Sequence, residues 1–473
     1  MEKKPDPDAI RLMASDFVII GGGQAGIPLA HALAQAGKST VLVERKNLGG
    51  SCINFGCTPT KAAIASAKLA FDSKRASEFG LRIPEVQIDF SGVLGQARSI
   101  SEASRKSLEQ GFENVPNLRL IRSHAKLIER DATGIFRIET KSEELLAKEV
   151  IINVGSRTFF PRISGLNQPQ VIHADNWLDQ TDLPEHLVIL GSGYIGFEMG
   201  QFYRRMGAQV TLLEGGPQVL KNEDADVAEN LESYLKAEGI SFLKNIQVNE
   251  FKYESGGWKI QLKDSVVEGS HVFVATGRKP NTDDLGLEKI GVRVDHKGYV
   301  LHDEKLSTNV PGVWVAGDAR GGPLFTHTAW DDFRILQSQI LGDGSRTLHR
   351  IVPYAIFTDP ELGRVGITEK QARTQRMDIA VAHFPFSENS KANELRETKG
   401  FIKLIADPKH DQLLGAAVVG AHASETVQLY VTLMNANAPY SVIRDAIYIH
   451  PTLAEAAQSA VSLLPTSSAR KAA

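Results

Sequence analysis

Cysteine is scarce in this chain, with two residues in 473. That number excludes a small scaffold held together by disulfides, and it leaves a structural zinc site, which needs four ligands, without enough thiols. Charge of one sign is not in excess, because 53 basic and 56 acidic residues give a net charge of -3. Nucleic acid and anionic membranes are therefore not expected as partners.

Long apolar runs are also absent, and none approaches the length of a membrane span. Residues 1–15 are charged and contain proline, without the apolar core of a signal peptide. We therefore expect a flexible N-terminal extension on a cytoplasmic protein. The length of the chain predicts about three domains.

The two cysteines, Cys52 and Cys57, lie close together in the segment 49–61, which is rich in glycine. A disulfide in a cytoplasmic protein is usually catalytic. Cys57 precedes a segment (61–68) that is rich in alanine and lysine and is predicted to be helical, and the helix N-terminus and Lys61 would both favour a thiolate. Because a dinucleotide-binding pattern comes just before, the segment predicts a redox-active disulfide beside a flavin; two inert buried cysteines are the alternative.

That dinucleotide-binding pattern occurs twice. In residues 16–44 an apolar strand leads to Gly21, Gly23 and Gly26, then to a helix ending near Gly37 and a strand ending at Glu44. Residues 186–214 repeat every landmark 170 positions later. A single copy would be weak evidence, whereas two copies in the same register strongly predict two Rossmann units.

In this pattern the glycines permit a tight turn and the close approach of a pyrophosphate, while the terminal acid binds ribose hydroxyls. A disulfide must touch a flavin to exchange electrons with it, so the first unit is predicted to bind FAD and the second a nicotinamide cofactor. Glu214 would repel a 2'-phosphate, which favours NADH over NADPH. We interpret Arg204 and Arg205, on the helix before it, as solvated surface residues.

The remaining segments also indicate that the protein belongs to the α/β fold class. Each unit closes with a strand that ends in glycine, at 150–155 and at 272–277, and the β-rich stretches 118–148 and 240–262 are predicted to be antiparallel crossovers. A third strand ends in glycine and an acid at 313–318. From about residue 350 the pattern changes to alternating strands and helices, which indicates a separate α+β domain.

Together these segments resemble the class I pyridine nucleotide-disulfide oxidoreductases, which include dihydrolipoamide dehydrogenase, glutathione reductase and mercuric reductase. The resemblance covers about residues 16–464. It is carried by the cysteine segment 49–61, the two dinucleotide-binding patterns, Ala-Thr-Gly-Arg-Lys-Pro-Asn at 275–281, Ala-Gly-Asp at 316–318 and Ile-His-Pro-Thr-Leu-Ala-Glu at 449–455.

This resemblance implies two Rossmann-like nucleotide domains and a C-terminal dimerisation domain. The expected boundaries are 16–156 with 281–348 for FAD, 157–280 for NAD and 349–473 for the interface. It also implies an obligate homodimer in which each C-terminal domain lends His450 to the partner's disulfide.

The resemblance further assigns the catalytic residues. Cys57 would be the thiol that lies against the flavin, and Cys52 would exchange with the substrate. His450 would be the acid/base, oriented by Glu455. Lys61 would lie near the flavin N5 and pair with Glu198 of the second nucleotide domain.

The cofactor-binding residues follow in the same way, and no metal site is expected. For FAD they are Gly21, Gly23, Gly26, Glu44, Gly50, Ser51, Lys61, Ala125, Gly155 and Asp318. For NAD they are Gly191, Gly193, Gly196, Glu214, Gly277 and Arg278.

Several of these residues have a simpler structural interpretation. Thr452 and Glu455 fit a capping box at the start of a helix over 453–464, so Glu455 could serve the Thr452 amide alone. Glu198 could be a first-turn helix acid, Lys61 a solvated lysine, and Asp318 the cap of a helix that begins near Gly322.

Among family members, the chain lacks the C-terminal cysteine pair of mercuric reductases, since residues 463–473 contain no cysteine. The segment 323–329 partly matches dihydrolipoamide dehydrogenases, and 324–334 is similar to hypochlorite-responsive reductases. We predict an NADH-linked disulfide/dithiol oxidoreductase most like dihydrolipoamide dehydrogenase. Its substrate would be a small or protein-bound disulfide, with a lipoyl carrier protein as one candidate. A reductase of metal ions or oxidants, and a non-catalytic NAD-binding subunit, are the alternatives.

Overall fold

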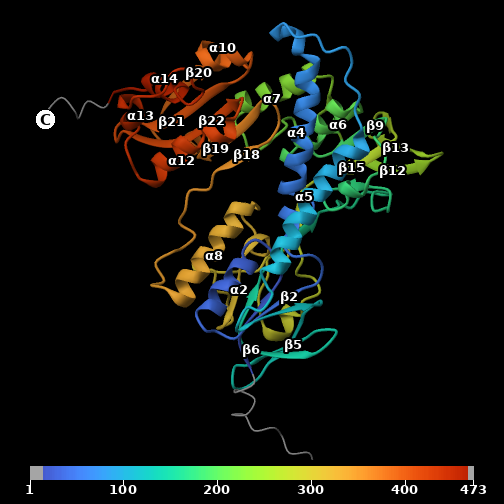
Figure 1. Cartoon of the computed structure of the whole chain (residues 1–473), viewed down its shortest axis with the longest axis vertical. Coiled ribbons are helices and arrows are strands. Elements are labelled where there is room, and N and C mark those ends of the chain that lie inside the picture. The colour runs from blue at the N-terminus through green and yellow to red at the C-terminus, as the bar shows by residue number, and fades with distance from the viewer. Residues whose placement is uncertain (1–13, 467–473) are drawn as a thin grey trace, which may run out of the picture.

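The computed structural model describes residues 14–466, which form three sheet-based units (Figure 1). The first unit lies at the bottom of Figure 1, the second at the upper right and the C-terminal unit at the upper left. Residues 1–13 of the expected extension lie outside the described residues, and Ser15 is already part of the first strand. The predicted α/β class is confirmed.

The first unit is built on a seven-stranded sheet in the order β3-β2-β1-β6-β5-β4, with β17 beside β6. The strands are β1 (Ser15–Ile20), β2 (Thr40–Glu44), β3 (Leu118–Arg122), β4 (Lys126–Arg130), β5 (Phe136–Glu139), β6 (Glu144–Ile152) and β17 (Val313–Val315). β1 runs parallel to β2 and β6. Val18 and Ile19 in β1 are both fully buried, as in a strand that is covered on both faces.

The helices of this unit position the cysteines. They are α2 (Gly26–Gln35), α3 (Gly50–Asn54), α4 (Cys57–Lys74), η1 (Ala76–Phe79), α5 (Phe90–Gln110), η3 (Leu287–Ile290), η4 (Gly317–Arg320) and α8 (Thr326–Leu341). α4 and α5 pack side by side and leave the first unit to reach α6 of the second (Figure 1). Within residues 14–466, no helix is both long and apolar enough to span a membrane.

The second unit repeats the nucleotide fold in a five-stranded parallel sheet of order β11-β10-β9-β15-β8. Its elements are β8 (Ile172–His173), η2 (Trp177–Asp179), β9 (His186–Leu190), α6 (Tyr194–Met206), β10 (Gln209–Leu213), α7 (Ala225–Ala237), β11 (Ser241–Leu243) and β15 (His271–Val274). An antiparallel sheet, β12 (Val248–Glu254), β13 (Gly257–Leu262) and β14 (Val266–Gly269), is attached to it. The short pair β7 (Ser156–Thr158) and β16 (Arg278–Pro280) joins the two units.

The expected antiparallel crossovers are only partly present. β3 and β11, which begin the two β-rich stretches, instead pair in parallel with β2 and β10 and extend the nucleotide sheets. Only the later strands, β4 to β6 and β12 to β14, are antiparallel. A short amphipathic strand has the same sequence pattern whichever way its partner runs, so the pattern could not distinguish the two arrangements.

The C-terminal unit is an antiparallel sheet of order β18-β19-β22-β21-β20 with short helices around it. The strands are β18 (Tyr354–Ile356), β19 (Glu361–Gly366), β20 (Ala380–Pro385), β21 (Phe401–Asp407) and β22 (Gln412–Gly420). The helices are α9 (Glu369–Thr374), η5 (Phe386–Glu388), α10 (Ser390–Leu395), α11 (Ala423–Thr426), α12 (Gln428–Asn435), α13 (Ser441–Asp445) and α14 (Ala456–Ser462). The separate α+β unit predicted from about residue 350 is therefore observed.

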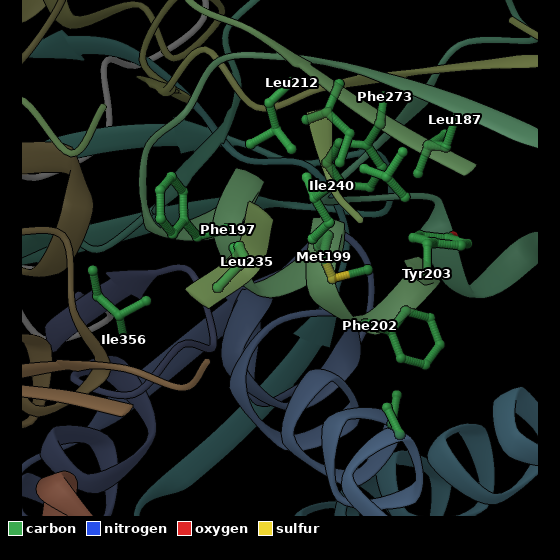
Figure 2. Close-up of a cluster of buried hydrophobic side chains, with 14 of the residues drawn as sticks. Leu187, Phe197, Met199, Phe202, Tyr203, Leu212, Leu235, Ile240, Phe273 and Ile356 are labelled. Carbon is green, nitrogen blue, oxygen red and sulfur yellow. The ribbon is translucent and has the colours of Figure 1, made fainter. Parts of the chain in front are cut away.

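One apolar core is shared by the second unit, the helices α4 and α5, and the C-terminal sheet. Figure 2 shows Phe197, Met199 and Phe202 of α6 at its centre, with Leu235 of α7 nearby. Ile356 of β18 belongs to the same cluster. Burying side chains of this size stabilises the fold by roughly 1.5–3 kcal/mol each, so the core fixes α4 relative to α6.

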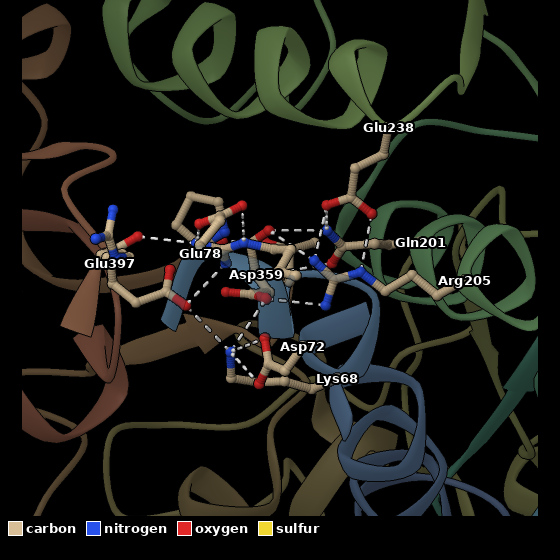
Figure 3. A network of polar contacts seen from close by, with 12 residues as sticks. Lys68, Asp72, Glu78, Gln201, Arg205, Glu238, Asp359 and Glu397 are labelled. Atoms are coloured by element: carbon tan, nitrogen blue, oxygen red, sulfur yellow. Dashed lines mark hydrogen bonds and ion pairs between the residues drawn. The ribbon is translucent and has the colours of Figure 1, made fainter. Parts of the chain in front are cut away.

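A network of charged side chains, buried at Arg205 and partly exposed at Lys68, also connects the three units (Figure 3). Arg205 of α6 lies 2.9 Å from Asp359 and 2.7 Å from Glu238, and its side chain is 4% exposed. Lys68 of α4 contacts Asp359 at 3.3 Å and Glu397 at 3.5 Å. Burial alone would raise the pKa of Asp359, but Arg205 and Lys68 outweigh it and hold the pKa below its usual value.

Candidate active site

A cavity of about 1010 Å³ lies where the three units meet, and both cysteines line it. Its walls come from the glycine turn before α2, the end of β2, helices α3, α4 and α6, the start of α8 and the segment 353–357. Elements of all three units thus face the same space, and its volume is in the range of small-molecule and cofactor sites.

The cysteines are brought together by a break between two helices. Cys52 lies in α3, and Cys57 is the first residue of α4. Gly56 makes the break possible, because a Cβ there would come within 2.8 Å of the Ser51 carbonyl oxygen. Both side chains are free thiols in the structure. The predicted position of Cys57 at a helix N-terminus is observed.

The two thiols differ in acidity. The pKa of Cys57 is lowered to about 6, first by a hydrogen bond with Cys52, and further by Thr326 and the charge of Lys61, against the effect of burial. The hydrogen bond with Cys57 and burial both raise the pKa of Cys52. Near neutral pH the pair therefore holds one thiolate, on Cys57, and one thiol, on Cys52.

Lys61 and Glu198 form the ion pair that was predicted between α4 and α6. The Lys61 Nζ lies 2.8 Å from Glu198 Oε2, and Glu198 is 5% exposed. The other carboxylate oxygen of Glu198 accepts a hydrogen bond from the Phe357 amide at 2.9 Å. Glu198 therefore does more than interact with the dipole of its helix, and Lys61 is not a fully solvated lysine. Their roles in catalysis stay predictions.

The first glycine turn fits a dinucleotide. A Cβ on Gly21 would lie 2.2 Å from the Asn153 carbonyl oxygen, and one on Gly26 would lie 2.3 Å from that of Gly21. Gly23, in contrast, has open space except for the Asn153 amide at 3.4 Å, so its backbone can meet a pyrophosphate. Gly23, Gly50 and Ser51 line the cavity.

Two acids line this part of the cavity. Glu44 accepts hydrogen bonds from the amides of Gly22 and Lys46, each at 2.7 Å. Asp318 accepts one from Ser156 Oγ at 2.5 Å and lies within η4, so it does not cap a helix near Gly322. Both carboxylates are therefore placed where contacts to FAD are possible, and those contacts stay predictions.

The second glycine turn has the same construction. A Cβ on Gly196 would lie 2.2 Å from the Gly191 carbonyl oxygen, while Gly193 has nothing within 4 Å. Glu214, at the end of β10, accepts hydrogen bonds from Ser192 Oγ at 2.5 Å and the Gly216 amide at 2.8 Å. The three glycines and Glu214 are not part of the lining of the 1010 Å³ cavity, although Tyr194 and Ile195 between Gly193 and Gly196 belong to it.

The interpretation of Arg204 and Arg205 as solvated residues is wrong for Arg205. Its guanidinium is buried between Glu238 and Asp359, which lie far from it in the sequence. Arg204 is partly buried and donates to the carbonyl oxygens of Ala208 and Glu238. Both side chains therefore have protein partners, which removes them as candidates for holding a 2'-phosphate.

Four further predicted cofactor residues lie in different surroundings. Gly155 lines the cavity with open space around it. Arg278, assigned to NAD, also lines it, with its Nε 2.6 Å from Ser156 Oγ and 3.8 Å from Asp318. Ala125 is 2% exposed in the core of the first unit and is not part of the lining, and Gly277 also lies outside it.

His450 and Glu455 lie in the C-terminal unit, apart from the cavity lining of their own chain. His450 Nδ1 is 3.0 Å from Glu455 Oε2, and the imidazole is 68% exposed. The other oxygen of Glu455 accepts from the Thr452 amide at 3.3 Å, so Glu455 makes the capping contact as well as the contact with His450. Its role in orienting a catalytic imidazole stays a prediction. Helix α14 begins at Ala456, three residues later than expected, because Thr452 and Glu455 form the turn before it.

Sequence reasoning assigned no role to several residues that line the cavity. Thr326 Oγ1 lies 3.1 Å from Cys57 Sγ. Phe325 stacks between His327 and Tyr354, with interplanar angles of 9° and 12°, and Tyr194 packs against it. Burial raises the pKa of Tyr194 to about 12. The segment 323–329 had been used only to compare family members, although its alternating aromatic and hydroxyl residues were a usable signal.

Comparison with known proteins places these features in a family. The family described as pyridine nucleotide-disulphide oxidoreductase matches residues 15–332, and the dimerisation domain of that family matches residues 352–461. A probable pyridine nucleotide-disulfide oxidoreductase, RclA of Escherichia coli, is 32% identical over 94% of this chain and 98% of its own. Dihydrolipoyl dehydrogenase of Geobacillus stearothermophilus is 29% identical over 95% and 96%.

Solved structures agree with this comparison. The Cu(II) complex of the HOCl-induced flavoprotein disulfide reductase RclA from E. coli superposes with a TM-score of 0.87 at 31% identity, covering 96% of this chain and 100% of that one. LpdA from Mycobacterium tuberculosis gives a TM-score of 0.87 at 25% identity, covering 95% and 99%.

Proposed function

The chain belongs to the pyridine nucleotide-disulphide oxidoreductases, and we propose that it is an NADH-dependent flavoprotein reductase that exchanges electrons with a disulfide substrate through Cys52 and Cys57. Its relatives are disulfide oxidoreductases, so the non-catalytic alternative is set aside. The observation that carries the proposal is the position of both cysteines on the wall of the cavity where the three units meet, with Cys52 in α3 and Cys57 at the N-terminus of α4. The lowered pKa of Cys57 and the raised pKa of Cys52 agree with it.

The family uses FAD and a pyridine nucleotide. The residues that would hold FAD are the glycine turn Gly21 to Gly26, the carboxylates of Glu44 and Asp318, and the start of α3. When bound there, FAD supplies a carrier that accepts a hydride from NADH and delivers an electron pair to the disulfide.

In the proposed exchange, the Cys52 sulfur attacks one sulfur of the substrate disulfide and gives its proton to an imidazole. The substrate S–S bond breaks, and the first leaving thiolate takes that proton back. The Cys57 thiolate then attacks Cys52, which re-forms the Cys52–Cys57 disulfide and releases the second thiolate, protonated by solvent. The net reaction is NADH, one proton and one disulfide giving NAD⁺ and two thiols.

The imidazole is assigned to His450 of the partner subunit. The match to the dimerisation domain at residues 352–461 supports a homodimer. The exposed imidazole is held by Glu455 on a surface that also exposes Ile447 and Ile449, at 101% and 80%. Large apolar side chains this exposed are common at subunit interfaces. We infer a cytoplasmic location, where a dithiol of this kind is kept reduced.

NADH should be preferred over NADPH by at least about tenfold in kcat/KM, roughly 1.4 kcal/mol. The reason is the carboxylate of Glu214, which is fixed at the end of β10 where a 2'-phosphate would approach. Steady-state rates with each nucleotide measure the preference. Equal or faster turnover of NADPH would contradict it, and Glu214→Gln should narrow the difference while Glu44→Gln should not.

The proposed function is tested by anaerobic NADH titration followed by a substrate panel of lipoamide, glutathione disulfide, Hg(II), Cu(II) and quinones. We expect sustained turnover of a disulfide that Cys52→Ser abolishes, and little sustained Hg(II) reduction, because Cys52 and Cys57 are the only thiols in the chain. Efficient Hg(II) reduction with no activity on any disulfide would refute the proposal.

A second candidate function is reduction of an oxidant or of Cu(II). The similarity to RclA favours it, because one RclA structure is described as a Cu(II) complex of an HOCl-induced enzyme. Across residues 14–466, no group of three or more His, Cys, Asp or Glu side chains is arranged to hold a metal. If Cu(II) is reduced by the thiol pair, its turnover should be lost in Cys52→Ser. Turnover of Cu(II) that survives in Cys52→Ser would instead place reduction at the flavin.

A further inference from the structure

The hydroxyl of Thr326 makes a contact that the proposed exchange does not use. It lies 3.1 Å from Cys57 Sγ, although the two residues are 269 positions apart in the sequence. Either atom could donate, so the bond can persist in both protonation states of the sulfur. As a thiolate, Cys57 can only accept, and the hydroxyl must then be the donor.

The position of Thr326 is fixed by its neighbours. Thr326 is the first residue of α8, and Thr328 closes the turn before it by donating to the Phe325 and Pro323 carbonyl oxygens at 2.7 and 2.9 Å. Because Thr328 serves this turn, the hydroxyl of Thr326 is left to face the sulfur.

The aromatic stack holds the same turn from the side. The Phe325 ring lies 5.3 Å from that of His327 and 5.5 Å from that of Tyr354. His327 Nε2 is bonded to the Pro353 carbonyl oxygen at 2.6 Å, and the Tyr354 hydroxyl is bonded to the buried Glu223. The start of α8 is therefore anchored to the C-terminal unit and through it to the second unit.

We propose that Thr326 is a positioning residue that donates a hydrogen bond to the Cys57 thiolate and so stabilises the negative charge on that sulfur. This inference deepens the proposed function and rests on it for its relevance to turnover. With Cys57 held as the thiolate, Cys52 is left as the thiol that meets the substrate. A hydrogen bond to the charged form favours ionisation, which agrees with the lowered pKa of Cys57. The same hydroxyl also lowers the pKa of Cys52, but there the hydrogen bond with Cys57 and burial outweigh it.

The contribution of Thr326 is separable from the other influences on Cys57. Lys61 acts by charge from within α4, and Cys52 acts through its own hydrogen bond. Thr326 acts through one neutral hydroxyl from α8, which Thr326→Val removes at nearly constant volume and without a change of charge. Thr326→Ser restores the hydroxyl and so provides a rescue variant.

The test measures the alkylation of Cys57 as a function of pH. In the Cys52→Ser background Cys57 is the only cysteine of the chain, so iodoacetamide labelling of the FAD-loaded protein reports one thiol. We expect Thr326→Val to raise the pH midpoint of labelling by about one pH unit. At pH values below the midpoint, this corresponds to an about tenfold smaller thiolate fraction of Cys57. Thr326→Ser should keep the midpoint within about 0.3 pH units of the background.

Thr60→Val is the matched control. Thr60 lies one turn along α4 from Cys57, but its hydroxyl donates to the Gly56 carbonyl oxygen at 2.8 Å. The same substitution there should leave the midpoint unchanged, whereas an equal shift in both variants would show that helix packing, not the hydrogen bond, controls Cys57. FAD absorbance of each purified variant checks that the fold is kept, and Thr326→Ala serves if Thr326→Val does not fold.

Two further outcomes overturn the proposal. One is an unchanged midpoint in Thr326→Val and Thr326→Ala, and the other is a shift that Thr326→Ser does not reverse. Because labelling needs neither NADH nor a disulfide substrate, these outcomes leave the proposed function intact. If Thr326→Val shows the expected shift of the labelling midpoint but the enzyme turns over no disulfide, the proposed function is rejected and the assignment of Thr326 is kept.

Discussion

Cys52→Ser should lose disulfide reductase activity by at least about 10³-fold while showing a broad long-wavelength charge-transfer absorbance in its oxidised-flavin form. The absorbance is expected because Cys57 remains, and Thr326 and the charge of Lys61 still lower its pKa. It should fade as the pH falls through the pKa of Cys57 in this variant, because protonation of Cys57 removes the donor. Anaerobic absorbance spectra recorded from pH 5 to pH 8 measure it.

Cys57→Ser is the counterpart, and it should lose both the activity and the absorbance. The remaining Cys52 is a thiol whose pKa burial still raises, and it lies in α3, not at the start of α4. An absorbance that follows Cys52 would show that the roles of the two cysteines are reversed. Slow electron transfer to oxygen or quinone is expected to continue in both variants.

About a quarter of wild-type activity should return when two inactive variants, Cys52→Ser and His450→Gln, are allowed to exchange subunits. If His450 serves the partner's cysteines, the mixed dimer has one site with both residues intact and one site with neither. With random pairing about half of the dimers are mixed, and each has one good site of two. Disulfide reductase activity after co-expression measures the recovery.

A tagged and an untagged subunit, purified through the tag, provide the control that mixing has occurred. If mixed dimers form and no activity returns, His450 acts within its own chain or not at all. The result also separates the two functions of Glu455, since a segment that only caps α14 would give unstable protein instead of folded dimers that complement each other.

The nucleotide turns could be predicted from the sequence because they leave little choice of residue. At Gly26 and Gly196 a Cβ atom would lie about 2.2–2.3 Å from a backbone oxygen, so only glycine fits. The glycine pattern in the sequence therefore predicts the tight turn. The cysteine segment is similar, since Gly56 is required for the break that places Cys57 at the start of α4. Local steric constraints of this kind can be predicted from short sequence motifs.

Contacts between distant segments were harder to predict. Arg205 was misassigned because its partner Asp359 comes from the C-terminal unit and nothing near Arg205 indicates that it is buried. Thr326 was overlooked because its distance to Cys57 depends on how α8 packs against α4. The direction of β3 was missed because strand pairing is not encoded in a five-residue amphipathic segment. The proposed position of His450 beside the cysteines cannot be tested in one chain, because it requires the partner subunit.

The ion network around Asp359 has a consequence for how the chain loses its structure. Separating the C-terminal unit would leave Arg205, 4% exposed, beside Glu238 alone, and would remove Asp359 and Glu397 from Lys68. Breaking a buried ion pair of this kind costs about 3–5 kcal/mol, a large part of the stability of a single domain. The helix that carries Cys57 is therefore secured at its far end by residues from both other units, and the three units should melt as one cooperative body, with the thiol pair dispersed in the same step.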